Sequence, residues 1–191
     1  VTEIHYEAFS GQPIEIITSF PPNLTLIKSS AFSGCLKLTK LPPFPPTLTE
    51  FGNEAFFRCG LTEIPSFPPS LTTIGVRVFE KCKALKKITS FPSALTDIKE
   101  GAFEDCGALE VIPCFPSTLQ TIGVSAFANC KSLATIRSSF PPNLSLGSHA
   151  FSFCGELRHV SLASTITATP TEKPNNIKKR GNTESLADAF V

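Results

Sequence analysis

Residues 71–94 of the chain read LTTIGVRVFEKCKALKKITSFPSA, and this stretch recurs with small changes along most of the sequence. Each copy places an apolar residue, a phenylalanine, a cysteine, a leucine, an isoleucine and a second phenylalanine at nearly fixed offsets. The first phenylalanine recurs every 23 or 24 residues, at Phe9, Phe32, Phe56, Phe79, Phe103, Phe127 and Phe151. A unit this short cannot bury its own apolar side chains, so we expect neighbouring copies to stack into a solenoid.

Two further columns support this reading. Cysteine stands three residues after the first phenylalanine in six copies, at Cys35, Cys59, Cys82, Cys106, Cys130 and Cys154. The second aromatic column is always followed by proline, at Phe20, Phe44, Phe67, Phe91, Phe115 and Phe140. Together the two aromatic columns hold 13 of the 17 phenylalanines, which indicates a core built from stacked rings.

The best strand candidate within the unit is the Leu-x-x-Ile segment, for example residues 85–88. Stacked copies would form a parallel sheet with one strand per coil and a spacing of about 4.7–4.9 Å. Prolines such as Pro65 and Pro113 follow these segments directly and cannot donate to a strand ladder. We therefore expect very short strands and interruptions of the sheet near the prolines, and a helical turn in the Ala-Phe-x-x-Cys stretch.

The pattern I-G-x-x-A-F-x-x-C-x-x-L-x-x-I, followed by a proline, resembles the BspA-like, or Treponema-type, leucine-rich repeats over about residues 4–162. The resemblance implies an α/β solenoid, a right-handed coil of about seven repeats with a short-stranded parallel sheet on its concave face. It also implies a secreted, periplasmic or cell-surface protein without catalytic activity. Such a protein would serve in adhesion or protein–protein interaction, with a host extracellular or cell-surface protein as its partner.

The sequence divides into three segments. Residues 1–24 form an irregular first copy, with Gln12 in place of the cysteine, and are expected to cap the solenoid. Residues 25–162 hold the regular repeats, and residues 163–191 form a polar tail. Leu186 and Phe190, in the closing segment 185–191, are expected to dock on the last coil or on a neighbouring molecule, with a frayed end as the alternative.

Composition excludes several classes of protein. A hydrophobic content of 41% argues against a disordered chain, and a net charge of +1 gives no electrostatic case for nucleic acid or an anionic membrane surface. No apolar run approaches the ~18 residues of a membrane-spanning helix. The first residues show no targeting pattern, so the compartment follows from the resemblance alone.

The sequence contains no recognisable catalytic or metal-binding motif. The cysteines contain no C-x-x-C, and His5, His149 and His159 stand in no nucleophile or metal motif, so we predict no catalytic residue, no metal and no cofactor. The column cysteines are expected to be buried free thiols that fill the core. Cys114 stands outside the column and is the first candidate for an exposed or dimer-forming thiol.

The candidate partner-binding residues occupy the third slot of the Leu-x-x-Ile segment, which points away from the core if side chains alternate. They are Lys40, Glu63, Lys87, Val111, Thr135 and His159, with Arg137 beside them. Their varied charge is typical of a recognition surface and equally of an unconstrained solvated face. A cluster of lysines over residues 81–87 can likewise be a solvated face or a site for an anionic partner.

Two other functions stay open. Two phenylalanines per coil are many for a narrow solenoid to bury. Instead of belonging to the ordinary core, Phe67, Phe91 and Phe115 could line a cleft for a hydrophobic ligand. The chain could also self-associate through the solenoid ends or the tail.

Overall fold

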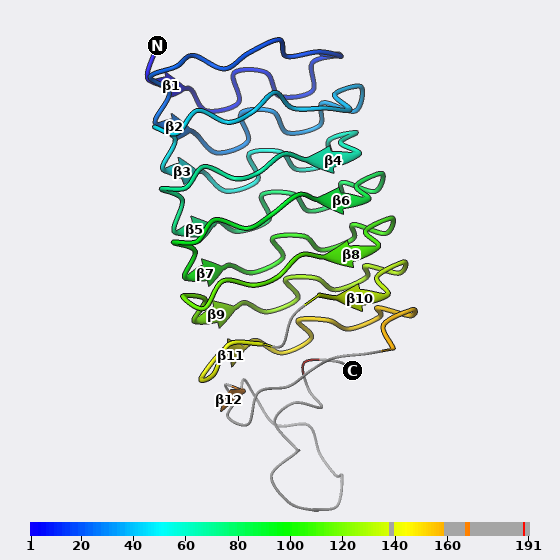
Figure 1. Ribbon diagram of the computed structural model, residues 1–191. Helices are drawn as coiled ribbons and strands as arrows, with labels where there is room; N and C mark the ends of the chain where they lie inside the picture. The colour runs from blue at the N-terminus through cyan, green and yellow to red at the C-terminus, as the bar shows by residue number, and fades with distance from the viewer. Residues whose placement is uncertain (138–139, 159–166, 169–188, 190–191) are drawn as a thin grey trace, which may run out of the picture.

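The computed structural model describes residues 1–137, 140–158, 167–168 and 189. The chain forms a parallel β-solenoid of about six turns, in which the coils lie one above another in a column (Figure 1). Every strand pairing in the described residues is parallel. The paired residues are 23 or 24 positions apart, except in the last pairing, where Ser145 and Thr167 are 22 positions apart. The solenoid predicted from the repeat is confirmed.

Two stacks of strands run along opposite edges of the coils (Figure 1). The first stack consists of β1 (Glu3–Ile4), β2 (Leu26–Ile27), β3 (Glu50–Phe51), β5 (Thr73–Ile74), β7 (Asp97–Ile98), β9 (Thr121–Ile122), β11 (Ser145–Leu146) and β12 (Thr167–Ala168). The second stack consists of β4 (Glu63–Ile64), β6 (Lys87–Ile88), β8 (Val111–Ile112) and β10 (Thr135–Ile136). Only the second stack, at the Leu-x-x-Ile segment, was predicted. The first stack forms at the pair of residues before the glycine of the I-G-x-x-A-F pattern, which we call the glycine slot, as Thr73 and Ile74 stand before Gly75.

The strands are as short as the prolines predict. Each of the strands named above has two residues. The segment Leu38–Leu41, which Pro42 and Pro43 follow, forms no strand although its sequence matches the pattern. In this stack the residue after the isoleucine donates to the preceding coil, as Thr89 does to Ile64, and Pro65 cannot make this bond to Leu41, which explains the interruption of the second stack.

The predicted helical turn is wrong, because the described residues up to 158 contain no helix. The Ala-Phe-x-x-Cys stretch instead forms consecutive tight turns, with left-handed residues on both sides of the phenylalanine, as at Arg77 (φ 55°) and Lys81 (φ 60°). The amide of Phe79 between them donates to the carbonyl of Ala102 in the next coil at 2.9 Å, and those of Arg77 and Lys81 also donate to the next coil. An α-helix would need these donors for bonds within the segment, so the α/β label is corrected to a parallel β-solenoid.

The count of seven repeats is not confirmed either. Seven phenylalanine positions delimit six intervals, and the first copy, residues 1–24, contributes a strand to the first stack only. The structure therefore closes about six turns.

The core consists of the two aromatic columns and the aliphatic residues between them. Phe103 is fully buried and stacks on Phe79 and Phe127, with ring centroids 5.4 and 5.0 Å apart. In the second column Phe91 stacks on Phe67 and Phe115 at 6.1 and 5.5 Å. Offset stacking of this kind adds to the hydrophobic free energy of burial in every coil.

Candidate partner-binding site

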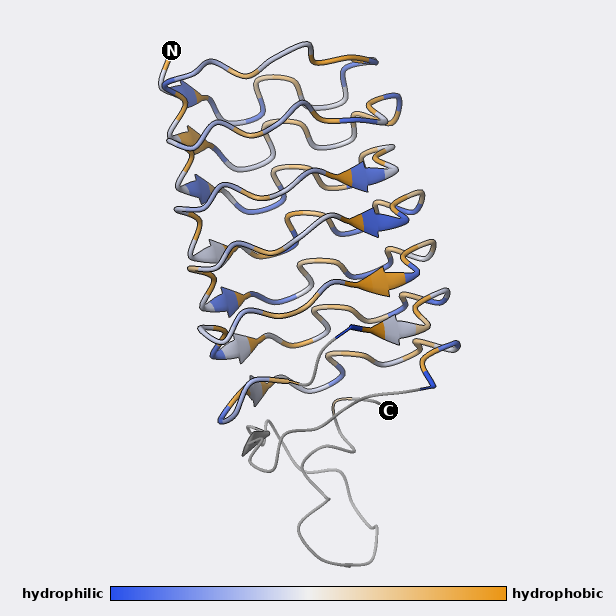
Figure 2. Cartoon of the chain, in the orientation of Figure 1, coloured by the Kyte–Doolittle hydropathy of each residue, from blue (hydrophilic) through white to orange (hydrophobic). Residues whose placement is uncertain are grey.

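Four of the candidate residues lie in one row across the second stack. The strand register pairs Glu63 with Lys87, Lys87 with Val111, and Val111 with Thr135. Figure 2 shows hydrophilic first residues in β4 and β6 and a hydrophobic one in β8. Each coil thus adds one side chain of different character to a continuous surface, which the repeat holds at a fixed spacing.

The other candidates are placed less favourably. Lys40 is exposed but belongs to no strand, for the reason given above. Arg137 is exposed and follows β10 directly, so it extends the row at its edge. His159 lies outside the described residues.

The argument from alternation left out two exposed positions on this surface, although one of them, Lys86, belongs to the lysine cluster noted in the sequence. Lys86 and Glu110 occupy the second slot of the Leu-x-x-Ile segment. They are exposed, although the residues in the third slot face solvent as well. Strict alternation would bury the second slot if the third faces solvent. The available signal was the spacing itself, because buried positions three residues apart, such as Leu85 and Ile88, do not fit a period of two.

Three of the predicted residues meet in one surface hollow. Lys87, Val111 and Arg137 line it, and five more residues complete it: Lys86, Ile88, Thr89, Glu110 and Pro113. Three cations and one carboxylate therefore surround a patch made by Val111 and Pro113. Such a mixture of uncommitted charge and apolar surface is what a protein partner can contact.

The charges of this hollow are not neutralised by neighbours. Within the described part of the chain, Lys86, Lys87, Glu110 and Arg137 form no ion pair, although Glu63 and Lys87 are register partners. These groups remain available to the charges of another molecule.

The outer face of the first stack differs in this respect. Lys28 pairs with Glu3 at 2.7 Å, and Lys99 pairs with Asp97 at 3.1 Å. Partial burial would raise the pKa of Asp97, but hydrogen bonds from Thr121, Thr96 and Lys99 outweigh it and hold the pKa below its usual value. Because its main charges already have partners, this face is the weaker candidate.

The aromatic residues considered for a ligand cleft are part of the core. Phe67, Phe91 and Phe115 are 5%, 8% and 7% exposed, and each stacks on the equivalent rings of adjacent coils. None of them lines the hollow at the second stack. We therefore do not propose a hydrophobic-ligand site there.

The column cysteines form a ladder of their own. The Cys106 thiol donates to the carbonyl of Phe79 in the preceding coil at 3.2 Å, and the other five column cysteines make the equivalent bond. Cys114 is exposed. Among the described residues, no group of three or more histidine, cysteine or acidic side chains is arranged to hold a metal.

Comparison with known proteins agrees with this geometry. A family model described as a BspA type leucine rich repeat region matches residues 2–133 and 65–173, in six copies. The chain belongs to the BspA-type leucine-rich-repeat family. A solved leucine-rich-repeat protein of Treponema pallidum is similar to this BspA-type chain at 31% identity and a TM-score of 0.76, covering 83% of this chain and 72% of that one.

Two more distant structures share the fold. A leucine-rich-repeat protein of Bacteroides ovatus matches with 22% identity and a TM-score of 0.54, over 88% of this chain and 60% of that one. The pneumococcal vaccine antigen PcpA matches with 21% identity and a TM-score of 0.57, over 87% of this chain and 57% of that one. No curated protein matches the BspA-type chain significantly. Its described residues include no helix with the length and apolarity needed to cross a membrane.

Proposed function

We propose that the chain is a non-catalytic recognition module of the adhesion type, which binds a partner protein at the exposed face of the second stack. The observation that carries the proposal is the hollow around Lys87, Val111 and Arg137, whose charges have no ion-pair partner among the described residues. A rigid stack of coils needs little ordering when it binds, so such a surface loses less free energy on association than a mobile loop. Family membership supports a surface or secreted location and a host or other cell-surface protein as the partner.

The test is a binding measurement with a charge-reversed surface. The chain is passed over an immobilised panel of purified extracellular-matrix and cell-surface proteins, and binding is followed by surface plasmon resonance. For each protein that binds, we expect the Lys87→Glu/Arg137→Glu variant to raise Kd at least tenfold, which is about 1.4 kcal/mol. Reversal replaces attraction by repulsion at the centre of the hollow.

A matched control separates the site from net charge. Lys37→Glu/Lys131→Glu changes the charge by the same amount at exposed residues outside the hollow, and should leave Kd within twofold. Equal losses in both double variants, or no loss in either, would contradict the proposed site. Self-association through the solenoid ends stays a prediction.

A further inference from the structure

One corner of the solenoid is shorter than the others. Two residues separate the column cysteine from the following leucine in five of the six copies, as Leu36 and Lys37 do after Cys35. In the remaining copy Gly60 alone stands between Cys59 and Leu61. This single-residue deletion accounts for the short 23-residue interval between Phe56 and Phe79.

The deletion pulls this corner against the preceding coil. A Cβ added to Gly60 would lie 2.1 Å from the carbonyl oxygen of Leu36, and the amide of Gly60 donates to the carbonyl of Cys35 at 3.2 Å. At the same slot in longer corners, a Cβ on Gly107 would meet nothing within 4 Å, and one on Gly155 only the Lys131 carbonyl oxygen at 3.9 Å. The close approach is therefore a property of the shortened corner and requires glycine.

The retracted corner leaves a notch between its two neighbours. Leu36 of the preceding coil and Lys83 and Ala84 of the following coil line it, with Cys59 and Gly60 between them. Arg58 and Lys81 complete the lining, and we call these seven residues the corner notch. The flanking corners are two strand spacings apart, about 9–10 Å, which leaves room for a side chain of another molecule.

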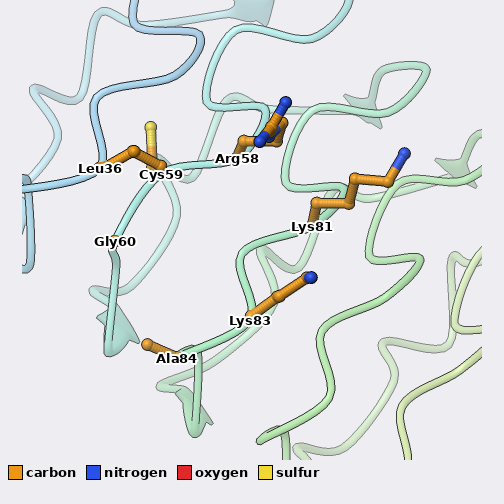
Figure 3. Close-up of a pocket in the computed structure, with 7 residues that line it drawn as sticks. All are labelled: Leu36, Arg58, Cys59, Gly60, Lys81, Lys83 and Ala84. Atoms are coloured by element: carbon orange, nitrogen blue, oxygen red, sulfur yellow. The ribbon is translucent and has the colours of Figure 1, made fainter. Parts of the chain in front are cut away.

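The corner notch is basic on one side and apolar on the other. Figure 3 shows the side chains of Arg58, Lys81 and Lys83 extending on one side, and Leu36 and Ala84 on the opposite side. Leu36 is 67% exposed and stands directly after its column cysteine, a slot in which Lys83 and Lys131 stand in other copies.

The cations are only partly neutralised. Lys81 pairs with the buried Glu80 at 2.7 Å, and its ammonium lies 5.2 Å from the centroid of the Phe57 ring. Arg58 and Lys83 form no ion pair with any residue that the structure describes. Two uncommitted positive charges therefore stand beside an exposed apolar side chain.

We propose that the corner notch binds an acidic segment of the protein partner. A carboxylate would lie between Arg58 and Lys83, and an adjacent apolar side chain would pack on Leu36 and Ala84. The charges select an anion, the apolar wall selects a peptide over an inorganic anion, and the deletion supplies the space. The inference rests on the proposed function, because it takes the partner to be a protein. It adds a second place at which that partner contacts the solenoid, and the chemistry of the segment that binds there.

The experiment uses two fluorescein-labelled heptapeptides and fluorescence anisotropy. One peptide alternates glutamate and leucine, and the other alternates glutamine and leucine, so that only the charge differs. We expect the full chain to bind the glutamate peptide at least tenfold more tightly. Lys83→Glu should raise the Kd for the glutamate peptide at least tenfold. Lys131 also directly follows a column cysteine, in another two-residue corner, so Lys131→Glu should leave the Kd within twofold of that of the unmodified chain.

A second variant tests the shape of the notch apart from its charge. Inserting one alanine after Gly60 restores the two-residue corner and keeps every cation. We expect it to weaken binding of the glutamate peptide at least tenfold, with a circular dichroism spectrum unchanged from the original chain. Unchanged affinity in this variant would overturn the proposal, because the charges alone would then suffice.

Other outcomes separate this inference from the proposed function. If Lys87→Glu/Arg137→Glu weakens peptide binding and Lys83→Glu does not, the peptide binds the second stack, the notch is excluded and the proposed function stands. Failure to bind the glutamate peptide overturns the notch proposal, as does binding of a heparin hexasaccharide alone, which would make the notch a polyanion site. Failure of the proposed function itself would appear in the separate panel experiment.

Discussion

The column cysteines show how one residue type meets two demands of a narrow core. The Cys82 side chain is fully buried beside the phenylalanine column, and its thiol donates to the carbonyl of Phe56 at 3.2 Å. That carbonyl lies in the preceding coil, so each thiol joins two coils as well as filling space. Burial raises the pKa of Cys82 to about 12, and those of Cys106 and Cys130 also rise well above the usual value.

These pKa shifts predict a loss of stability at alkaline pH. The unfolded thiol has a pKa of about 8.5, so its contribution is fully present below that pH and is lost as the pH rises toward the folded-state value. For Cys82 the loss amounts to about 2 kcal/mol by pH 10. Urea unfolding at pH 7.5 and pH 10 should show a smaller loss for Cys82→Ala than for the original chain.

Cys114→Ala is the matched control, because Cys114 is exposed and outside the ladder. It should keep the full alkaline loss of the original chain. If both variants lose stability equally between the two pH values, titration of the buried thiols is not the cause.

At the scale of the element, the spacing between coils depends on particular backbone contacts. Gly123 follows β9, and a Cβ added there would lie 2.6 Å from the amide nitrogen of Glu100 in the preceding coil. Neither backbone can move without disturbing the β7–β9 register, in which Ile98 pairs with Ile122. The glycine slot after the first stack is thus a point of contact between coils.

We expect Gly123→Ala to lower the free energy of unfolding by about 1–3 kcal/mol, the usual cost of overpacking a well-packed interior. Gly107→Ala, in an open corner, should change it by less than about 0.5 kcal/mol. Urea denaturation followed by circular dichroism measures both. A Gly123→Ala variant as stable as the original would show that the coils separate at little cost.

At the scale of the whole molecule, the open end of the solenoid meets part of the tail. β12 pairs with β11 in parallel, and the amide of Phe151 donates to the carbonyl of Ala189 at 2.7 Å. In the coils before it, the equivalent amide of Phe127 donates to Ala150 at 2.8 Å. Residues of the tail therefore accept bonds that a further coil would accept. The predicted docking of Leu186 and Phe190 stays a prediction, because both lie outside the described residues.

Truncation after Leu162 tests this contact. We expect the thermal midpoint to fall by about 2–8 °C, as a loss of about 1–2 kcal/mol would produce in a chain of this size. Ala189→Arg, in the full-length chain, should lower it as well because Ala189 is 1% exposed. An unchanged midpoint in both, measured by differential scanning calorimetry, would mean that the tail does not stabilise the solenoid.

Much of the fold and part of the candidate site were predictable from individual positions. The spacing of the phenylalanines predicts the stacked coils, since a unit of 23–24 residues has no other way to bury two rings. The prolines after the Leu-x-x-Ile segments predict very short strands. The third slot of that segment identified Lys87, Val111 and, with its neighbour, Arg137, but alternation hid Lys86 and Glu110.

The repeat, its apolar columns and the pairing of each coil with the next follow from the residue pattern, because they depend on periodic burial. The turns of the Ala-Phe-x-x-Cys stretch depend on contacts in three dimensions, since its amides bond to the following coil instead of forming a helix. Which charges find partners was also a tertiary outcome: Asp97 has Lys99 beside it, whereas Lys87 and Arg137 have no ion-pair partner among the described residues. The corner notch is the clearest case, because a missing residue is visible in the sequence but the space it leaves depends on where the neighbouring coils lie.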